Sequence, residues 1–142
     1  MLTTGFPRFE GDLFGSFVLE LAKELRSREV DVEVVAPHED GLQTAEYLSG
    51  VRIRRFRYFV PRWQRLAYGG GIPANIAMSW WARIQVPFFL LAFLLTAVRA
   101  AKGSDLIHCH WTVTGLVAIW AAKIHRLPLV LSVRGSDIHS MK

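Results

Sequence analysis

The chain has 142 residues, of which 51% are apolar and 20% are charged. This composition fits one globular domain and excludes global disorder. The single cysteine, Cys109, excludes an intrachain disulfide and fits a reducing compartment. Residues 1–12 hold no long apolar stretch, so we expect no secretory signal peptide.

Charge is distributed unevenly along the chain. Residues 1–46 carry a net charge of −6, whereas residues 47–104 carry +9 and contain no Asp or Glu. The middle block also holds eleven of the seventeen aromatic residues, and residues 105–142 carry +2. Such asymmetry bears on the partners of a protein more than on its fold.

Apolar periodicity, β-branched runs and Gly/Pro breaks predict alternating strands and helices. In chain order we expect a strand at 2–5, a helix at 12–28 with Asp12 as N-cap, and a strand at 30–36. A polar excursion at 38–50, an Arg-rich strand at 51–60 and an irregular loop at 61–79 follow, and then a helix at 79–102 that Pro87 breaks or starts. The last expected elements are a strand at 106–109, a strand at 129–133 and, between them, a helix at 112–126 with one apolar face made of Leu116, Val117, Trp120, Ala121 and Ile124.

This order predicts a doubly wound α/β domain, because the later strands are continuous apolar runs typical of a parallel sheet covered on both faces. Ligands of such sheets bind outside the carboxyl ends of the strands. Three loops lie there, at 5–15, 110–114 and 134–139.

The longest uncharged apolar stretch is 84–98, which as a helix reaches roughly 22 Å against the roughly 30 Å of a hydrocarbon core. We therefore do not expect a transmembrane span. Two interpretations stay open: a buried helix of a globular domain, or a helix lying partly in a membrane interface, with Trp80 and Trp81 at headgroup level.

The first loop has features of an anion site. Gly11 and Gly15 let the backbone approach a ligand near a helix N-terminus, and Arg8 adds a guanidinium. Glu10 and Asp12 would oppose a phosphate, so their carboxylates are better suited to capping the helix or to meeting sugar hydroxyls. The loop lacks the dinucleotide fingerprint, and an ordinary tight turn is the structural alternative.

The second loop places His108 and His110 on the same side of a strand. We expect no metal site, because no acidic or further His/Cys cluster accompanies the pair. His110 is expected to face the cleft as an acid/base or hydrogen-bonding group, and His108 to be buried.

The third loop combines a turn with charged side chains. Gly135 permits a turn beside Ser136, Arg134 is suited to phosphate, and Asp137 either accepts a proton or caps the next helix.

The acid-free block interleaves arginines with aromatic residues, a pattern that fits nucleic acid, anionic lipid or a solvated edge strand. The adjacent apolar helix favours a membrane over nucleic acid. The expected membrane or acceptor contacts are Arg54, Arg57, Arg62, Arg65, Trp63, Trp80 and Trp81.

Taken in order, several segments resemble the N-terminal half of family 4 glycosyltransferases. They are residues 3–12 (TTGFPRFEGD), 66–73 (LAYGGGIP), 105–111 (DLIHCHW) and 134–137 (RGSD). The resemblance covers nearly the whole chain and implies a GT-B fold, in which two Rossmann-like domains face a cleft. The N-terminal domain binds mainly the acceptor, and the C-terminal domain binds the nucleotide-sugar donor.

The resemblance implies retaining transfer from a nucleotide sugar, with no bound metal or other cofactor, to a lipid-linked or polysaccharide acceptor at the cytoplasmic membrane face. It places Gly11 and Gly15 near donor phosphate and acceptor, and His110 in the cleft. Arg134 occupies the position of a family histidine, so a proton-accepting role there does not carry over, and Asp137 is the other candidate catalytic residue.

Residues 1–142 are expected to be a partial acceptor-side domain, clipped at its first strand, without the donor-binding domain and inactive alone. The alternatives are a non-catalytic α/β module that binds anionic lipid or a protein partner, and a nucleotide-dependent enzyme of another doubly wound class. The missing dinucleotide fingerprint counts against the latter.

Overall fold

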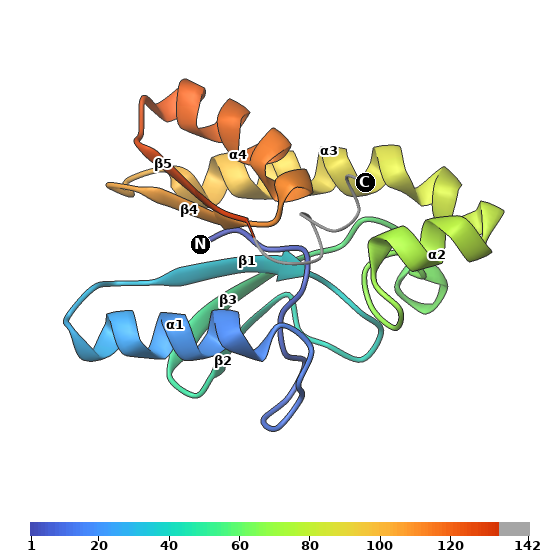
Figure 1. The fold of residues 1–142 in the computed structure, drawn as a ribbon, viewed down its shortest axis with the longest axis horizontal. Coiled ribbons are helices and arrows are strands. Elements are labelled where there is room, and N and C mark those ends of the chain that lie inside the picture. Colours follow the sequence, from blue (N-terminus) through green and yellow to red (C-terminus); the bar gives the residue numbers. More distant parts are fainter. Residues whose placement is uncertain (134–142) are drawn as a thin grey trace.

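The computed structural model describes residues 1–133, which form a sheet with helices on both faces (Figure 1). Helix α1 (Ser16–Ser27) covers one face, and helices α3 (Trp80–Ala101) and α4 (Thr112–His125) cover the other. This arrangement confirms the predicted doubly wound α/β fold.

The centre of the sheet is a short N-terminal segment. Strand β1 (Glu33–Pro37) pairs in parallel with β3 (Val51–Phe56), and β4 (Ile107–His110) pairs in parallel with β5 (Leu129–Ser132). Leu2 forms parallel bridges to both β1 and β4 and so joins the two groups. The expected first strand is therefore reduced to a bridge, but it occupies the central position that the pattern requires.

Strand β2 (Ala45–Leu48) lies in the stretch expected to be a polar excursion. It pairs antiparallel with β3, and the two strands are joined through Ser49 and Gly50, both with positive φ (48° and 79°). This is the conformation of a tight two-residue hairpin turn. Strand β3 consequently lies inside the sheet, between β1 and β2, and the interpretation of the Arg-rich strand as a solvated edge is wrong.

The loop expected at 61–79 contains two short helices, η1 (Pro61–Trp63) and α2 (Ile72–Met78). Proline lies at the start of each, where its fixed φ and missing N–H favour a helix. Helix α3 follows, capped by the Ser79 side chain, and it runs through Pro87 without a break. Pro87 is exposed, and the expectation that it breaks or starts the helix is wrong.

Helix α3 packs against the sheet through aromatic rings. The Phe56 ring of β3 stacks on Phe93 with centroids 4.5 Å apart, and it meets Phe89 edge to face at 5.0 Å. All three side chains are buried. This cluster fixes which face of α3 is turned inward.

Helix α4 buries a different face from the one that the sequence suggests. Its inner side is made of small residues such as Gly115 and Ala118, together with the predicted Val117 and Ala121. Leu116, Trp120 and Ile124 are instead about 60% exposed. Because α4 is apolar on all sides, its periodicity does not select the buried face, whereas close approach to the sheet and α3 selects small side chains.

Candidate functional site

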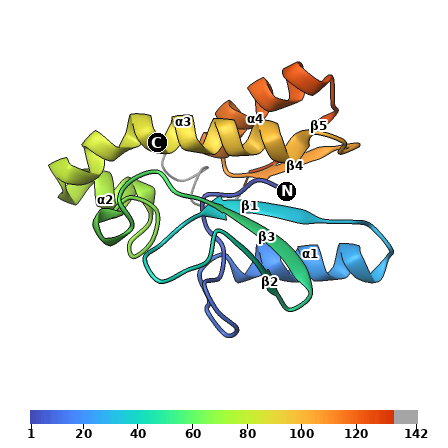
Figure 2. The same ribbon diagram turned by 180° about the vertical axis from the view of Figure 1, so that it is seen from behind.

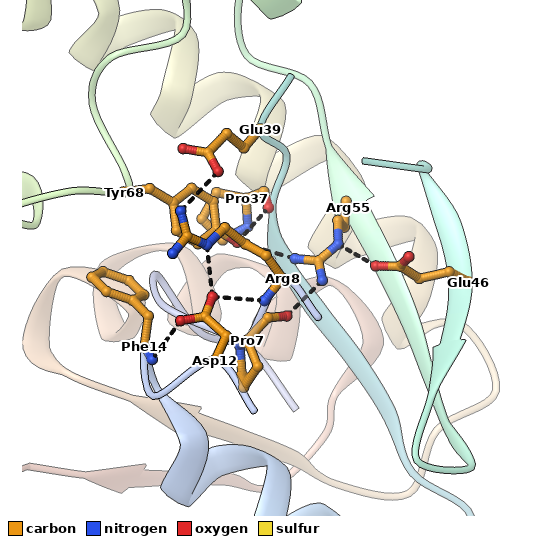
Figure 3. Close-up of polar contacts among 9 residues, drawn as sticks. All are labelled: Pro7, Arg8, Asp12, Phe14, Pro37, Glu39, Glu46, Arg55 and Tyr68. Atoms are coloured by element: carbon orange, nitrogen blue, oxygen red, sulfur yellow. Dashed lines mark hydrogen bonds and ion pairs between the residues drawn. The ribbon is translucent and has the colours of Figure 1, made fainter. Parts of the chain in front are cut away.

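The loops that leave the carboxyl ends of the Leu2 segment, β1 and β3 converge on one polar cluster (Figure 3). Asp12 organises the first of these loops. Its carboxylate accepts hydrogen bonds from the Arg8 backbone N–H (3.0 Å), the Arg8 Nε (2.6 Å) and the Phe14 N–H (3.1 Å). The Arg8 side chain is the main reason that the pKa of Asp12 is lowered to about 2. Asp12 therefore does not cap α1, and the prediction of an N-cap at this position is wrong.

Helix α1 begins instead after Gly15, which has a φ of 70°. A Cβ atom at Gly15 would meet the carbonyl group of Gly5, so only glycine lets the helix start this close to the first loop. Gly11 also has positive φ (89°), but open space surrounds it. The predicted ligand contacts of Gly11 and Gly15 stay predictions, while Gly15 has a clear packing role.

Arg8 lies between two carboxylates and two rings. Beyond Asp12 it donates from Nη1 to Glu39 (3.1 Å), and its guanidinium lies over the rings of Tyr68 and Phe9, 5.4 Å and 5.7 Å from their centroids. The hydrogen bond to Asp12 is the largest cause of a raised pKa of the Arg8 guanidinium. Phosphate binding by Arg8 stays a prediction, and these carboxylates oppose it electrostatically.

Arg55 of β3 belongs to the same cluster, and its side chain is buried (Figure 3). Its three donor nitrogens reach Glu46 on β2, the Tyr68 hydroxyl (3.0 Å) and the Pro7 carbonyl (2.7 Å). The Tyr68 hydroxyl in turn donates to the Pro37 carbonyl (3.0 Å), and burial raises its pKa. Arg55 thus ties the first loop, β2 and the segment after β3 to one another.

Sequence reasoning missed Arg55, Glu39, Tyr68 and Phe14 as members of this cluster. The partners of Arg55 lie 9 to 48 residues away in the chain, so no local pattern indicates them. The run Leu48–Ser49–Gly50–Val51 is the one available signal, because a predicted hairpin there would have paired Glu46 with Ile53, two residues from Arg55 on the same face of β3.

The two histidines of β4 lie on the same side of the strand, as predicted, with ring centroids 4.5 Å apart. His108 is half-buried, so the expectation that it is buried is wrong, and its Nε2 lies 2.8 Å from the Ser132 hydroxyl. The His110 side chain is fully buried, with the rings of Phe17 and Trp111 6.0 Å and 6.4 Å from its own ring, centroid to centroid. That His110 faces the cleft and acts in catalysis stays a prediction.

Trp111, at the end of β4, has an unusual backbone conformation, with φ of 67° and ψ of 150°. This region is adopted almost exclusively by glycine. Its N–H donates to the Ser132 carbonyl (3.1 Å), its carbonyl accepts from Gly115 (3.2 Å), and its indole meets Phe17 edge to face at 5.4 Å. Such strain persists where the surroundings hold it, and it is concentrated at functional sites.

The third predicted loop, with Arg134, Gly135, Ser136 and Asp137, lies outside the described residues. Within residues 1–133, no group of three or more His, Cys, Asp or Glu side chains is placed to hold a metal ion.

The predicted membrane or acceptor contacts divide into two places. Trp63, Trp80 and Trp81 form a ring cluster, in which Trp81 lies 6.5 Å from Trp63 and 5.6 Å from Trp80. Arg54 is not part of it, because its side chain pairs with Glu33 (2.9 Å) near the amino end of β1. The grouping of Arg54 with the tryptophans is therefore a misassignment.

Arg57, Arg62 and Arg65 remain candidate membrane or acceptor contacts beside the tryptophan cluster. All three are exposed, and within the described chain none of them takes part in an ion pair.

A cavity of about 620 Å³ lies at the opposite, amino-terminal edge of the sheet. Its lining includes Met1, Glu33, Arg99, Lys102 and Asp105. The cavity is remote from the carboxyl ends of the strands, where doubly wound sheets bind their ligands, so we assign the candidate site to the polar cluster of Figure 3.

Comparison with known proteins shows similarity to one protein family and to solved structures. The family model for a "Glycosyl transferase 4-like domain" matches residues 15–142. Among solved structures, a sucrose-phosphate synthase from Thermosynechococcus elongatus is similar, with a TM-score of 0.52 and 15% sequence identity. That match covers 97% of this chain and 64% of the other, and at this identity it shows the fold alone. No curated protein matches the chain.

Proposed function

Because the chain belongs to the family of glycosyl transferase 4-like domains, we propose that it forms the acceptor-binding side of a retaining glycosyltransferase. The donor is a nucleotide sugar, and the acceptor is a lipid-linked molecule or a polysaccharide at the cytoplasmic face of the membrane. Family membership supports this enzyme interpretation over a non-catalytic module and over another nucleotide-dependent class. The fold is the one expected for the N-terminal domain of a GT-B enzyme.

One observation carries the assignment of the acceptor side: Arg8, Glu39 and Tyr68 converge at the carboxyl edge of the sheet (Figure 3). Glu39 is half-buried, and one of its oxygens is bound to Arg8. A carboxylate and a guanidinium held side by side can accept from one sugar hydroxyl and donate to the next. Since carboxylates surround Arg8, this cluster suits hydroxyl groups better than phosphate.

In the proposed transfer, the bond between the anomeric carbon and the donor phosphate oxygen breaks. The acceptor hydroxyl oxygen bonds to that carbon on the same face, and its proton leaves with the phosphate. Binding and orientation of the acceptor are the tasks of this domain. His110 and Asp137 are the proposed catalytic residues, and no resident metal or other cofactor takes part.

The acceptor site can be tested by adding methyl α-glucoside and methyl α-mannoside to ¹⁵N-labelled protein. We expect amide shifts at residues 5–15, 39 and 68. Glu39→Gln should weaken this binding at least fivefold, whereas Glu20→Gln, an exposed change on α1, should leave it unchanged. Shifts confined to other surfaces, or equal binding by Glu39→Gln, would overturn the assignment.

The proposal also predicts that residues 1–142 alone transfer no sugar, because the donor site belongs to the second domain of the family. Incubation with UDP- and GDP-hexoses and the glycoside acceptors should give no product. Sustained turnover by this chain would contradict the division of labour between the two domains.

A further inference from the structure

We propose that α3 lies in the plane of an anionic membrane surface, with one exposed face inserted and the aromatic and basic end of the molecule at headgroup level. The inference adds a surface and an orientation to the membrane part of the proposed function. It is independent of sugar transfer, because its observations concern α3 and its neighbours rather than the polar cluster.

The face in question is an apolar stripe on α3. We call it the outer stripe; it consists of Trp80, Ile84, Phe88, Leu91 and Leu95, which are 43–66% exposed. Their spacing of three and four residues places them in one line along the helix, roughly 22 Å long. A continuous apolar line of this length on a soluble surface indicates contact with a partner or a membrane.

Length alone would allow α3 to span a bilayer. Within residues 1–133 it is the one helix long and apolar enough to do so, at roughly 33 Å. Its inner face, however, holds Phe89 and Phe93 against Phe56 of the sheet. A spanning orientation would pull this face away from β3 and expose the aromatic core. An in-plane orientation keeps the fold and inserts the opposite face.

Gln85 also ties α3 to the neighbouring segment. Its buried side chain donates from Nε2 to the Trp63 carbonyl (2.7 Å) and accepts the Arg65 N–H at Oε1 (3.0 Å). These bonds fix η1, with Trp63, beside the start of α3. Figure 2 shows α2 at this same end of α3, and its last residue, Met78, is 88% exposed. The outer stripe therefore continues into an exposed aromatic end.

The charges at this end select the partner. Arg57, Arg62 and Arg65 are exposed, have no ion-pair partner in the part of the chain that the structure describes, and lie in a block without any Asp or Glu. Tryptophan prefers the headgroup level of a bilayer, and arginine is attracted by anionic lipids. A second copy of this chain would bring two cationic surfaces together, so charge favours an anionic membrane over self-association.

Vesicle co-sedimentation of the full chain tests the proposal. We expect binding to phosphatidylcholine vesicles with half phosphatidylglycerol, at least tenfold weaker binding to pure phosphatidylcholine, and release at 1 M NaCl. Phe88→Glu with Leu91→Glu, and separately Arg62→Glu with Arg65→Glu, should each weaken binding at least tenfold. Circular dichroism checks that each variant folds.

The matched control is Leu116→Glu with Ile124→Glu, since these side chains are somewhat more exposed than Phe88 and Leu91 but lie on α4. It should bind like the wild type. Orientation is tested by carbonate extraction at pH 11, which should release an in-plane helix, and by quenching with lipids brominated near the interface, which should exceed quenching by lipids brominated near the bilayer centre.

Three outcomes would overturn the proposal. One is an absence of binding to the anionic vesicles. Another is an equal loss of binding in the α4 control, and a third is retention of the protein after carbonate extraction. Self-association that Phe88→Glu with Leu91→Glu abolishes, without vesicle binding, would assign the outer stripe to a second copy instead. Failure of the glycoside titration would leave the membrane assignment standing, so the two proposals fail separately.

Discussion

The backbone of Trp111 allows a direct measurement of strain at the carboxyl edge of the sheet. Its φ of 67° and ψ of 150° suit glycine and penalise every residue with a Cβ atom. We propose to compare Trp111→Ala with Trp111→Gly. Both variants lose the indole and its contact with Phe17, so their difference isolates the backbone.

The magnitude follows from two opposing effects. A non-glycine residue in this region costs on the order of 1–3 kcal/mol, which Trp111→Gly removes and Trp111→Ala retains. Glycine lowers stability by about 0.4–1 kcal/mol through the greater freedom of its unfolded chain. The strain is the larger effect, so Trp111→Gly should be more stable than Trp111→Ala by about 1 kcal/mol. This is the reverse of the usual order of the two residues.

Urea denaturation followed by circular dichroism measures the difference in the free energy of unfolding. Ile119→Ala and Ile119→Gly provide the control, because Ile119 lies in the interior of α4 and is partly exposed. There glycine should be the less stable variant by about 1 kcal/mol. If Trp111→Gly proves equal to or less stable than Trp111→Ala, the backbone is not strained in solution and the reasoning fails.

Three further changes test the polar cluster, each by urea denaturation. Asp12→Asn should lower the free energy of unfolding by about 1–2 kcal/mol at pH 7. The pKa of Asp12 is about 2 in the folded protein and 3.8 in the unfolded chain, so its contribution to stability is present above pH 4 and disappears as the pH falls toward 2, where the stabilities of the two proteins should converge. Gly15→Ala should lower the free energy of unfolding by about 3 kcal/mol or more, because the new Cβ would meet the backbone of the first loop, whereas Gly11→Ala has open space and should lower it by about 1 kcal/mol. Similar losses of stability in the two variants would contradict the packing role of Gly15. Arg55→Met should lower the free energy of unfolding by about 3 kcal/mol because it leaves buried partners unpaired, whereas the exposed change Arg54→Met should lower it by less than 1 kcal/mol. A small effect of Arg55→Met would show that Arg55 is not buried as described.

The order of elements was predictable because it depends on local patterns. The largely apolar runs 106–109 and 129–133 predicted the parallel strands, and strands β4 and β5 overlap these runs. The ends of the helices were harder to predict from local residue types. An Asp side chain can cap a helix or accept hydrogen bonds within a loop, and in this protein Asp12 accepts them from Arg8, four positions earlier in the same loop.

The polar cluster was not predictable in the same way, because it is made by long-range contacts. Arg8 meets Glu39 across 31 residues, and Arg55 meets the Pro7 carbonyl across 48. A sequence shows that each side chain is charged but not which loops the sheet brings together. The edge-to-face contact of His110 with Phe17 of α1, with ring centroids 6.0 Å apart, is likewise made between different elements.

The charge asymmetry illustrates how folding changes the meaning of a linear pattern. Strand β3 carries three of the nine positive charges of residues 47–104, and the sheet places it between β1 and β2, which carry carboxylates. Arg54 is paired with Glu33, and Arg55 with Glu46. Of the positive charges left on the surface, Arg57, Arg62 and Arg65 follow β3 beside the tryptophans, whereas Arg99 and Lys102 lie at the other end of α3. Because β3 is neutralised by its neighbours, the basic surface that we propose for an anionic membrane is smaller than the acid-free block and follows the carboxyl end of β3. The proposed membrane surface and the proposed acceptor site therefore lie at the same edge of the sheet.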